Sequence, residues 1–289
     1  MISLPQIPSP PRDLVAQLVR LGFASAGAQF ETLYGGRTNQ VWKVLGDDSD
    51  QVLKLYRSDL ENPLFRNDPA LEAACLRALA SSGVVPRLRA TGQHDNGYWV
   101  FYDHAQGTPW RSDPAPVARL LHRLHSLNPN IENAPTGKNG SADLAEHGQS
   151  ILAMCTSDRR AQLEKMQPQH HILRSDHTCL IHGDPVAGNI LVASSGLTLI
   201  DWQCPAVGDP CEDLALFLSP AMQYLYRGAV LTVDEQQSFL SAYDRQETVN
   251  RYRSLRRWYG WRMAAYCLWR AEHGAPDYEQ GLELELAAL

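Results

Sequence analysis

The sequence lacks long apolar runs, and no stretch approaches the roughly 18 consecutive apolar residues that a membrane-spanning helix needs. Residues 1–12 also lack the basic-then-apolar order of a secretory signal. A basic excess is missing too, because 26 Lys and Arg face 32 Asp and Glu, which gives a formal net charge of −6. These absences argue against a membrane span and against a nucleic-acid surface, and they predict a cytoplasmic protein.

Cysteine pairs at metal-binding spacing are absent as well. No C-x-x-C pair occurs, and the cysteines mostly lie in apolar surroundings, so we expect reduced, buried thiols. The six are Cys75, Cys155, Cys179, Cys204, Cys211 and Cys267. There is no internal repeat and no low-complexity tail. A chain of 289 residues with 44% apolar residues is long enough for one large domain or for two lobes, each with its own core.

What is present in the first hundred residues is a mixture of strand and helix patterns. Branched and aromatic residues between glycine-rich or polar turns predict five strands. These are 30–34, 40–45, 51–56, 87–92 and 98–102. Apolar residues at helical spacing predict one helix over 11–21, and Asp68-Pro69 is typical of the start of another that stops at Gly83. We therefore expect a five-stranded antiparallel sheet with a helix.

The pattern becomes mostly helical after residue 102. Helical spacing predicts helices near 117–124, 142–166, 209–218, 233–245 and 249–273. The natural boundary is a hinge near 103–107, which divides the chain into an N-terminal lobe, 1–103, and a C-terminal lobe, 104–289. The predicted class is thus an α+β fold of two lobes, with a nucleotide-sized cleft between them.

One segment, His182 to Leu191, carries the clearest chemistry. Asp184 and Asn189 stand at the two ends of a tight loop, and a strand pattern, a Ser-Ser-Gly turn and a second apolar run follow. Because a hairpin returns the chain to where it left, Asp201 is expected beside Asn189. Two carboxylates and an amide that converge suit Mg²⁺, which prefers oxygen ligands, and suit phosphoryl transfer, which needs positioned charge.

This His-x-Asp-x-x-x-x-Asn spacing, followed by an Asp after the next hairpin, resembles the catalytic and metal-binding loops of protein-kinase-like enzymes. Gly183 stands where protein kinases usually carry Arg. The His-Gly-Asp form is similar to aminoglycoside phosphotransferases and to choline, ethanolamine and thiamine kinases. The resemblance implies a bilobal protein-kinase-like fold with a catalytic hairpin in the C-terminal lobe. It also implies that Asp184 accepts the substrate hydroxyl's hydrogen bond and that Asn189 and Asp201 hold Mg²⁺ against the phosphates of ATP.

The N-terminal lobe contains residues that could bind the nucleotide. The loop with Gly35, Gly36, Thr38 and Asn39 lies between two strands, where glycines would let backbone N–H groups approach phosphates. It resembles the Gly-Gly-x-Thr-Asn loop of the choline and thiamine kinase relatives. The alternative is an ordinary glycine-rich turn that only joins two strands.

Two charged residues extend this nucleotide-binding interpretation. Lys54 is the only charge in its short strand, and its spacing from the glycine loop matches the family's phosphate-pairing lysine. Glu72 is the candidate partner for it. An exposed strand lysine and a solvated helix glutamate are the alternatives.

Three neighbouring residues are interpreted as structural. We expect His182 to brace the loop without moving protons, and Trp202 to pack in the place of the Phe of an Asp-Phe-Gly signature. The stretch from Gly208 to Ala215 resembles the Gly-Asp-Pro-x-x-Asp-Leu-Ala element of the same families. Within it, Asp213 is expected to hydrogen-bond the catalytic loop and not the substrate.

The acceptor is less well defined by the sequence. Gln203 replaces the acid that usually follows in choline and thiamine relatives. The last long helical stretch is rich in aromatic residues and also contains a methionine. These side chains form either a cation-binding cage or ordinary core. They are Trp258, Tyr259, Trp261, Met263, Tyr266 and Trp269. Four arginines on the same stretch, Arg256, Arg257, Arg262 and Arg270, weaken any attraction for a cation.

The sequence therefore predicts a small-molecule kinase that uses ATP and Mg²⁺. Its partner is a small-molecule hydroxyl substrate, with a choline-like aminoalcohol favoured. The alternatives are an aminoglycoside or another small hydroxyl compound as acceptor, or a catalytically silent nucleotide-binding scaffold of the same fold. Because Lys54, Asp184, Asn189 and Asp201 are all present, the enzyme is favoured over the scaffold.

Overall fold

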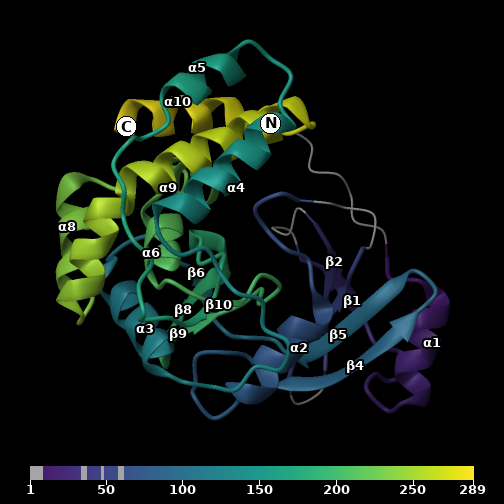
Figure 1. Ribbon diagram of the computed structural model, residues 1–289. Helices are drawn as coiled ribbons and strands as arrows, with labels where there is room; N and C mark the ends of the chain where they lie inside the picture. The colour runs from purple at the N-terminus through teal and green to yellow at the C-terminus, as the bar shows by residue number, and fades with distance from the viewer. Residues whose placement is uncertain (1–8, 34–37, 47–48, 58–61) are drawn as a thin grey trace.

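A five-stranded antiparallel sheet forms the first part of the molecule (Figure 1). The computed structural model describes residues 9–33, 38–46, 49–57 and 62–289, and its sheet has the strand order β1-β2-β3-β5-β4. The strands are β1 (Phe30–Thr32), β2 (Gln40–Val44), β3 (Gln51–Leu55), β4 (Leu88–His94) and β5 (Gly97–Asp103). All five predicted strands are thereby confirmed, although the predicted end of the first, at Tyr34, lies outside the described residues.

The two faces of this sheet pack against different partners. Its flanking helices are α1 (Arg12–Arg20) and α2 (Pro69–Ala78). Leu53 in β3 shares a core with Leu14 of α1, whereas its neighbour Val52 belongs to the larger core on the α2 side. Successive strand residues point to opposite faces, so Lys54 shares the face of Val52. The strand thus directs the lysine toward the second part of the molecule.

Helix α2 begins as its sequence predicts. The Asp68 side chain accepts hydrogen bonds from the backbone N–H groups of Ala70 (2.9 Å) and Leu71 (3.1 Å), and Pro69 occupies the first turn. This cap satisfies donors that have no partner inside the helix. Glu72 lies in the same first turn, so the cap also fixes the position of its side chain.

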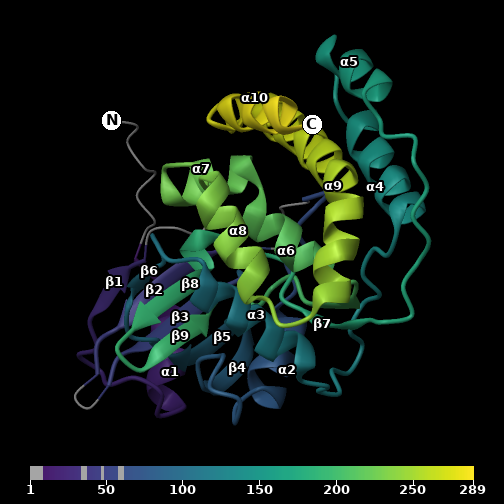
Figure 2. The same ribbon diagram turned by 90° about the vertical axis from the view of Figure 1, so that its left-hand side faces the viewer.

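Helices dominate the second part, where they pack around two small sheets (Figure 2). The helices are α3 (Ala115–Ser126), α4 (Ser141–Ala153), α5 (Arg159–Lys165), α6 (Cys211–Leu218), α7 (Pro220–Arg227), α8 (Val233–Ala242), α9 (Gln246–Glu272) and α10 (Tyr278–Ala288), with a 3₁₀ turn at Ala187–Asn189. The strands are β6 (Thr108–Pro109), β8 (Ile190–Ala193) and β9 (Gly196–Leu199) in one sheet, and β7 (Cys179–Ile181) and β10 (Ala206–Gly208) in the other.

The structure corrects one predicted helix and adds others. The single helix expected over 142–166 is two helices, because the chain turns between α4 and α5. Glu272 of α9 accepts hydrogen bonds from the backbone N–H groups of Thr156 (2.7 Å) and Ser157 (3.0 Å) at that turn. Helices α7 and α10 and the short strands β6, β7 and β10 were not predicted. The division at residue 103 stays a prediction.

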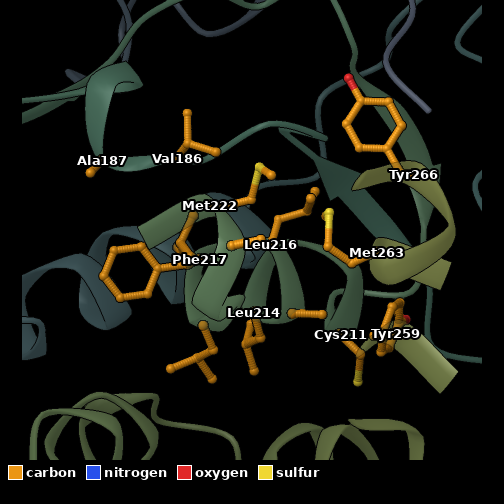
Figure 3. Close-up of a cluster of buried hydrophobic side chains, with 14 of the residues drawn as sticks. Val186, Ala187, Cys211, Leu214, Leu216, Phe217, Met222, Tyr259, Met263 and Tyr266 are labelled. Carbon is orange, nitrogen blue, oxygen red and sulfur yellow. The ribbon is translucent and has the colours of Figure 1, made fainter. Parts of the chain in front are cut away.

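A large apolar core extends from the α2 side of the sheet into the helices of the second part. Figure 3 shows part of it, where Val186 and Ala187 lie near Met222 and the side chains of α6.

All six cysteines are free and buried, as predicted. Within the described ranges, no helix is long and apolar enough to cross a membrane.

Candidate active site

The hairpin of β8 and β9 brings the predicted metal-binding residues together. Ile190 pairs with Leu199, and the N–H of Ile200 donates to the carbonyl oxygen of Asn189 (2.9 Å). Asn189 and Asp201 therefore leave the hairpin at the same end. The Asn189 amide donates to the backbone oxygen (2.9 Å) and to Oδ2 (3.1 Å) of Asp184. All three side chains line one pocket.

The backbone of Asp201 has an uncommon conformation. Its φ of 65° lies in the left-handed region that residues other than glycine rarely adopt, although Asp and Asn tolerate it better than most. The Asp201 carboxylate also forms an ion pair with Lys54. The local backbone and the ion pair thus both determine where this carboxylate lies.

Lys54 and Glu72 form a buried ion pair, as the family resemblance implies. Lys54 Nζ lies 2.8 Å from Glu72 Oε2, and the side chains are 3% and 1% exposed, which excludes the alternative of solvated charges. The hydroxyl of Tyr56 also hydrogen-bonds Glu72. Burial would lower the pKa of Lys54, but the charges of Asp201 and Glu72 raise it above its usual value. The lysine is therefore a permanent cation that is held from two sides.

The turn at 182–184 is held by Asp213 from α6. Its carboxylate accepts hydrogen bonds from the backbone N–H groups of His182 (2.8 Å) and Gly183 (2.8 Å) and contacts His125 Nε2 at 3.0 Å. Burial alone would raise the pKa of Asp213, but these hydrogen bonds and the nearby histidines lower it. Asp213 thus contacts the loop as predicted for a structural residue.

Gly183 and His182 fit their positions for steric and hydrogen-bonding reasons. Gly183 has φ of 80°, and a Cβ on it would overlap the carbonyl oxygen of Cys204. His182 is fully buried against Trp202, with Nε2 at 3.0 Å from the carbonyl oxygen of Ile200. Burial lowers the pKa of His182. A neutral imidazole that donates from Nε2 braces the loop, in agreement with its predicted role.

Asp184 faces the pocket with unused hydrogen-bonding capacity. Among the described residues, only its Oδ2 has a side-chain partner, the Asn189 amide. Burial raises the pKa of Asp184 well above its usual value, and the nearby charge of Asp201 raises it further. A carboxylate in this setting is a stronger base than a solvated one and can accept a hydrogen bond from a hydroxyl group.

The residues of the predicted phosphate loop are only partly described. Gly35 and Gly36 lie outside the described residues, whereas Thr38 lines the pocket. Asn39 is buried, and its amide donates to Gln203 Oε1 (2.8 Å) and to Asn67 Oδ1 (2.7 Å). The side chain of Asn39 therefore links the sheet to the segment after Asp201.

The oxygens available near Asp201 fit a hard divalent cation. Oδ1 of Asn189 and Oδ2 of Asp201 have no hydrogen-bond partner in the part of the chain that the structure describes, and both residues line the same pocket. No three His, Cys, Asp or Glu residues among those described form a metal-binding group. Two protein oxygens are few, but they suit Mg²⁺, which usually keeps water and substrate phosphate as further ligands.

The rest of the pocket lining is mostly aromatic. Phe65, Tyr226, Tyr266, Tyr278 and Asn62 line it together with Arg270. Of these, only Tyr266 and Arg270 were singled out from the sequence. The others come from the segment after β3, from α7 and from α10, and no local spacing connects these three segments.

Most of the aromatic side chains on α9 are core, which was one of the two alternatives. Trp258, Tyr259, Trp261, Met263 and Trp269 are buried and do not line the pocket. Trp261, for example, donates from its ring nitrogen to the carbonyl oxygen of Leu163 (2.8 Å). Tyr266 alone of this set reaches the pocket, so the helix does not by itself form a cation cage.

Comparison with known proteins identifies the family of this chain. The model of a family described as "Phosphotransferase enzyme family" (APH) matches residues 29–259, which is more than half of the chain. A search of curated proteins found no match.

Several solved structures share the fold at low sequence identity. A choline/ethanolamine kinase family protein from Mesorhizobium loti has a TM-score of 0.66 and 18% identity, over 96% of this chain and 92% of that one. Choline kinase LicA from Streptococcus pneumoniae has a TM-score of 0.63 and 16% identity, over 96% and 98%. A spectinomycin phosphotransferase, in complex with ADP and spectinomycin, has a TM-score of 0.63 and 14% identity, over 95% and 97%. Identities this low show the fold and leave the substrate open.

Proposed function

Since the chain belongs to the APH phosphotransferase family and has its kinase-like α+β fold, we propose that it transfers the γ-phosphoryl group of ATP to a hydroxyl group of a small molecule. One observation carries this proposal: Asp184, Asn189 and Asp201 meet in one pocket, and the buried Lys54–Glu72 pair reaches Asp201 from the sheet. Phosphoryl transfer needs little else from a protein than positioned charge.

Different residues would bind different parts of Mg-ATP. Lys54, held by Glu72, would pair with phosphate oxygens, and Thr38 and the glycines at 35 and 36 would bring backbone N–H groups to the phosphates. Asn189 and Asp201 would hold Mg²⁺. When it is bound, this ion neutralises charge on the phosphates and fixes their orientation.

Asp184 is the proposed catalytic residue. Its carboxylate would accept the hydrogen bond of the acceptor hydroxyl and so orient the attacking oxygen toward the γ-phosphorus. The Asn189 amide holds this carboxylate, and Asp213 holds the turn that carries it. The transferred proton would pass to Asp184, whose raised pKa supports that role.

The acceptor class is the finer part of the proposal. The sequence favours an aminoalcohol, with an aminoglycoside as the alternative, and solved structures of both kinds of kinase share the fold. The aromatic lining suits a compact organic molecule, but Arg270 in the same lining disfavours an acceptor whose only charge is positive. We therefore propose a small hydroxyl compound as the acceptor, without assigning choline itself.

Turnover is the decisive test, because a silent scaffold of the same fold would also bind Mg-ATP. We expect ADP release with at least one member of a panel of aminoalcohols, thiamine, sugars, hydroxy acids and aminoglycosides. Asp184→Ala is expected to lower that rate by at least about a hundredfold while the protein stays folded, because the hydroxyl loses its orienting carboxylate.

A matched control for this test is Asp158→Ala. Asp158 is exposed, and its side chain makes no cap hydrogen bond at the start of α5, so normal turnover is expected. Thermal unfolding by circular dichroism would show whether both variants fold. Normal turnover in folded Asp184→Ala would overturn the role of Asp184, and Mg-ATP binding without any turnover would favour the scaffold.

A further inference from the structure

Arg270 is a cation in the aromatic part of the pocket lining, and it has no acidic partner among the described residues. It extends from α9 into the lining, and no ion pair or side-chain hydrogen bond to its guanidinium is found among the described residues. Within the described ranges, its Nε is buried and has no hydrogen-bond partner. The only acids in the described lining are Asp184 and Asp201, and Asp201 already pairs with Lys54. A partly buried guanidinium without a counter-ion is costly unless a bound group supplies one.

The aromatic rings around Arg270 already contact this cation. The centre of the guanidinium lies 5.2 Å from the ring centroid of Tyr278 and 5.9 Å from that of Trp269. These distances are those of cation–π contacts, the same contacts that a quaternary ammonium group would need. A cationic acceptor would therefore meet a like charge where the aromatic lining could otherwise attract it.

A second hydrogen-bond donor lies one helical turn before Arg270. The hydroxyl oxygen of Tyr266 accepts a hydrogen bond from the Asn62 amide (2.9 Å), so its own hydrogen stays available. Figure 3 shows this hydroxyl pointing away from the apolar cluster that holds the ring. Residues four apart lie on one face of a helix, so α9 presents the phenol and the guanidinium to the same pocket.

We propose that the acceptor carries an anionic group, a carboxylate or a phosphate ester, in addition to its hydroxyl, and that Arg270 binds this group with Tyr266 as a second donor. This inference rests on the proposed phosphotransferase function and names its substrate class. Arginine matches the planar, two-oxygen geometry of carboxylates and phosphates, and Tyr266 can donate to a third oxygen. Arg270 is then a specificity-determining residue, and Asp184 remains the catalytic one.

Acceptors that differ mainly in charge test the proposal directly. Steady-state ADP release would be measured with 3-hydroxypropanoate, glycerol 3-phosphate, choline and 3,3-dimethyl-1-butanol, the last being the uncharged counterpart of choline. We expect kcat/KM for at least one of the two anions to exceed that for choline and for the neutral alcohol by at least about tenfold. The two anions separate a carboxylate from a phosphate requirement. A higher kcat/KM for choline than for both anions would overturn the proposal and leave the phosphotransferase function standing.

Variants of Arg270 link this preference to the residue. Arg270→Gln is expected to raise KM for the preferred anion about ten- to hundredfold, with a smaller change in kcat. Arg270→Lys should recover only part of the loss, because it keeps the charge and loses the paired geometry. Arg257→Gln, an exposed arginine on the same helix, is the matched control and should change neither constant. A rise in the KM for ATP, with the acceptor KM unchanged, would place Arg270 on the nucleotide and overturn the proposal.

Binding separates failure of the inference from failure of the proposed function. Calorimetric titration of 3-hydroxypropanoate and of glycerol 3-phosphate into the protein with Mg-ADP needs no turnover. If no acceptor reacts but one anion binds and Arg270→Gln weakens it at least about tenfold, the function fails and anion recognition stands. If neither anion binds, or if binding is equal in wild type and Arg270→Gln, the inference is overturned whatever the turnover results.

Discussion

The part of the pocket that we propose binds the nucleotide, called the nucleotide side, and the part that we propose binds the acceptor, called the acceptor side, differ in how their charges are paired. On the nucleotide side, Lys54 pairs with Glu72 and with Asp201, and every one of these charges has a partner. On the acceptor side, Arg270 lies against aromatic rings, and no acidic partner is found in the described part of the chain. The positions of paired charges are fixed by their partners within the protein, whereas the contribution of an unpaired charge depends on the ligand that binds it.

This difference indicates which side of the pocket would serve every acceptor and which would distinguish one acceptor from another. The proposed donor, ATP, is the same whatever the acceptor, so an ion pair that forms without a ligand suits the nucleotide side. Acceptors differ, and the side chains that meet them come from separate segments. Changes on the nucleotide side should therefore lower turnover of all acceptors equally, and changes on the acceptor side should alter the ranking of acceptors.

The largest effect is expected for Asp201→Asn. The amide keeps the left-handed backbone accessible but removes the negative charge that pairs with Lys54 and that would hold Mg²⁺. We expect kcat to fall at least about a hundredfold for every acceptor, as measured by ADP release. Asp113→Asn is the matched control, because Asp113 has φ of 58° and lies exposed outside the pocket. Unequal losses among acceptors would contradict the division into two sides.

The next effect concerns Glu285, which supports the helices of the acceptor side. This residue of α10 is 2% exposed, and its carboxyl group accepts hydrogen bonds from the Ser219 hydroxyl and from the N–H of Ala221 (3.1 Å) in α7. Burial raises the pKa of Glu285 to about 7, and the hydrogen bonds from Ser219 and Ala221 offset only part of that rise.

A raised pKa means that the folded protein binds this proton more tightly than the unfolded chain does. The free energy of unfolding should therefore fall as the pH rises from about 4.5 to about 7, by up to about 3 kcal/mol. Glu285→Gln should lack this fall and be more stable than wild type at pH 8. Urea unfolding at pH 5 and pH 8 would measure it, with the exposed Glu283→Gln as control. The idea is wrong if the stability difference between wild type and Glu285→Gln is the same at both pH values.

A smaller effect is expected when the lysine loses one of its two partners. Glu72→Gln removes one charge that positions Lys54, while the ion pair of Lys54 with Asp201 remains and the new amide oxygen can still accept the hydrogen bond of the Tyr56 hydroxyl. We expect kcat/KM to fall about tenfold with every acceptor, which corresponds to about 1.4 kcal/mol. The exposed Glu31→Gln in β1 should leave kcat/KM unchanged. An acceptor-dependent loss would show that Glu72 acts on more than the nucleotide.

The smallest expected effect is that of Tyr266→Phe. This change removes one hydrogen bond to Asn62 and one donor from the acceptor side, so KM for the acceptor should rise a few-fold, or by about 1 kcal/mol, while KM for ATP stays constant. Tyr259→Phe on the same helix is the control, since among the described residues its buried hydroxyl has no hydrogen-bond partner. Equal effects of the two changes on the acceptor KM would remove Tyr266 from the acceptor side.

The nucleotide side could be predicted from the sequence because its residues lie in units with fixed local geometry. A hairpin must bring Asn189 and Asp201 together, and strand alternation with a capped helix places Lys54 and Glu72 on facing elements. The roles of these residues stay predictions, and Gly35 and Gly36 lie outside the described residues.

The acceptor side could not be predicted, because Phe65, Tyr226 and Tyr278 meet only after distant segments pack together. The break between α4 and α5 was missed for a related reason. The helical spacing over 142–166 is real, but Glu272, more than 100 residues later, binds the N–H groups of Thr156 and Ser157 and ends the pattern. Contacts of this kind have no signature in a local window of sequence.

The contact between Gly183 and Cys204 has an evolutionary consequence. Any side chain at position 183 would collide with the carbonyl oxygen of Cys204, so a change to the arginine usual in protein kinases is barred until the segment after Asp201 has moved. That segment is joined to the sheet through Gln203 and Asn39. A side chain at position 183 is therefore accommodated in this chain only together with a shift of that segment and of its link to the sheet.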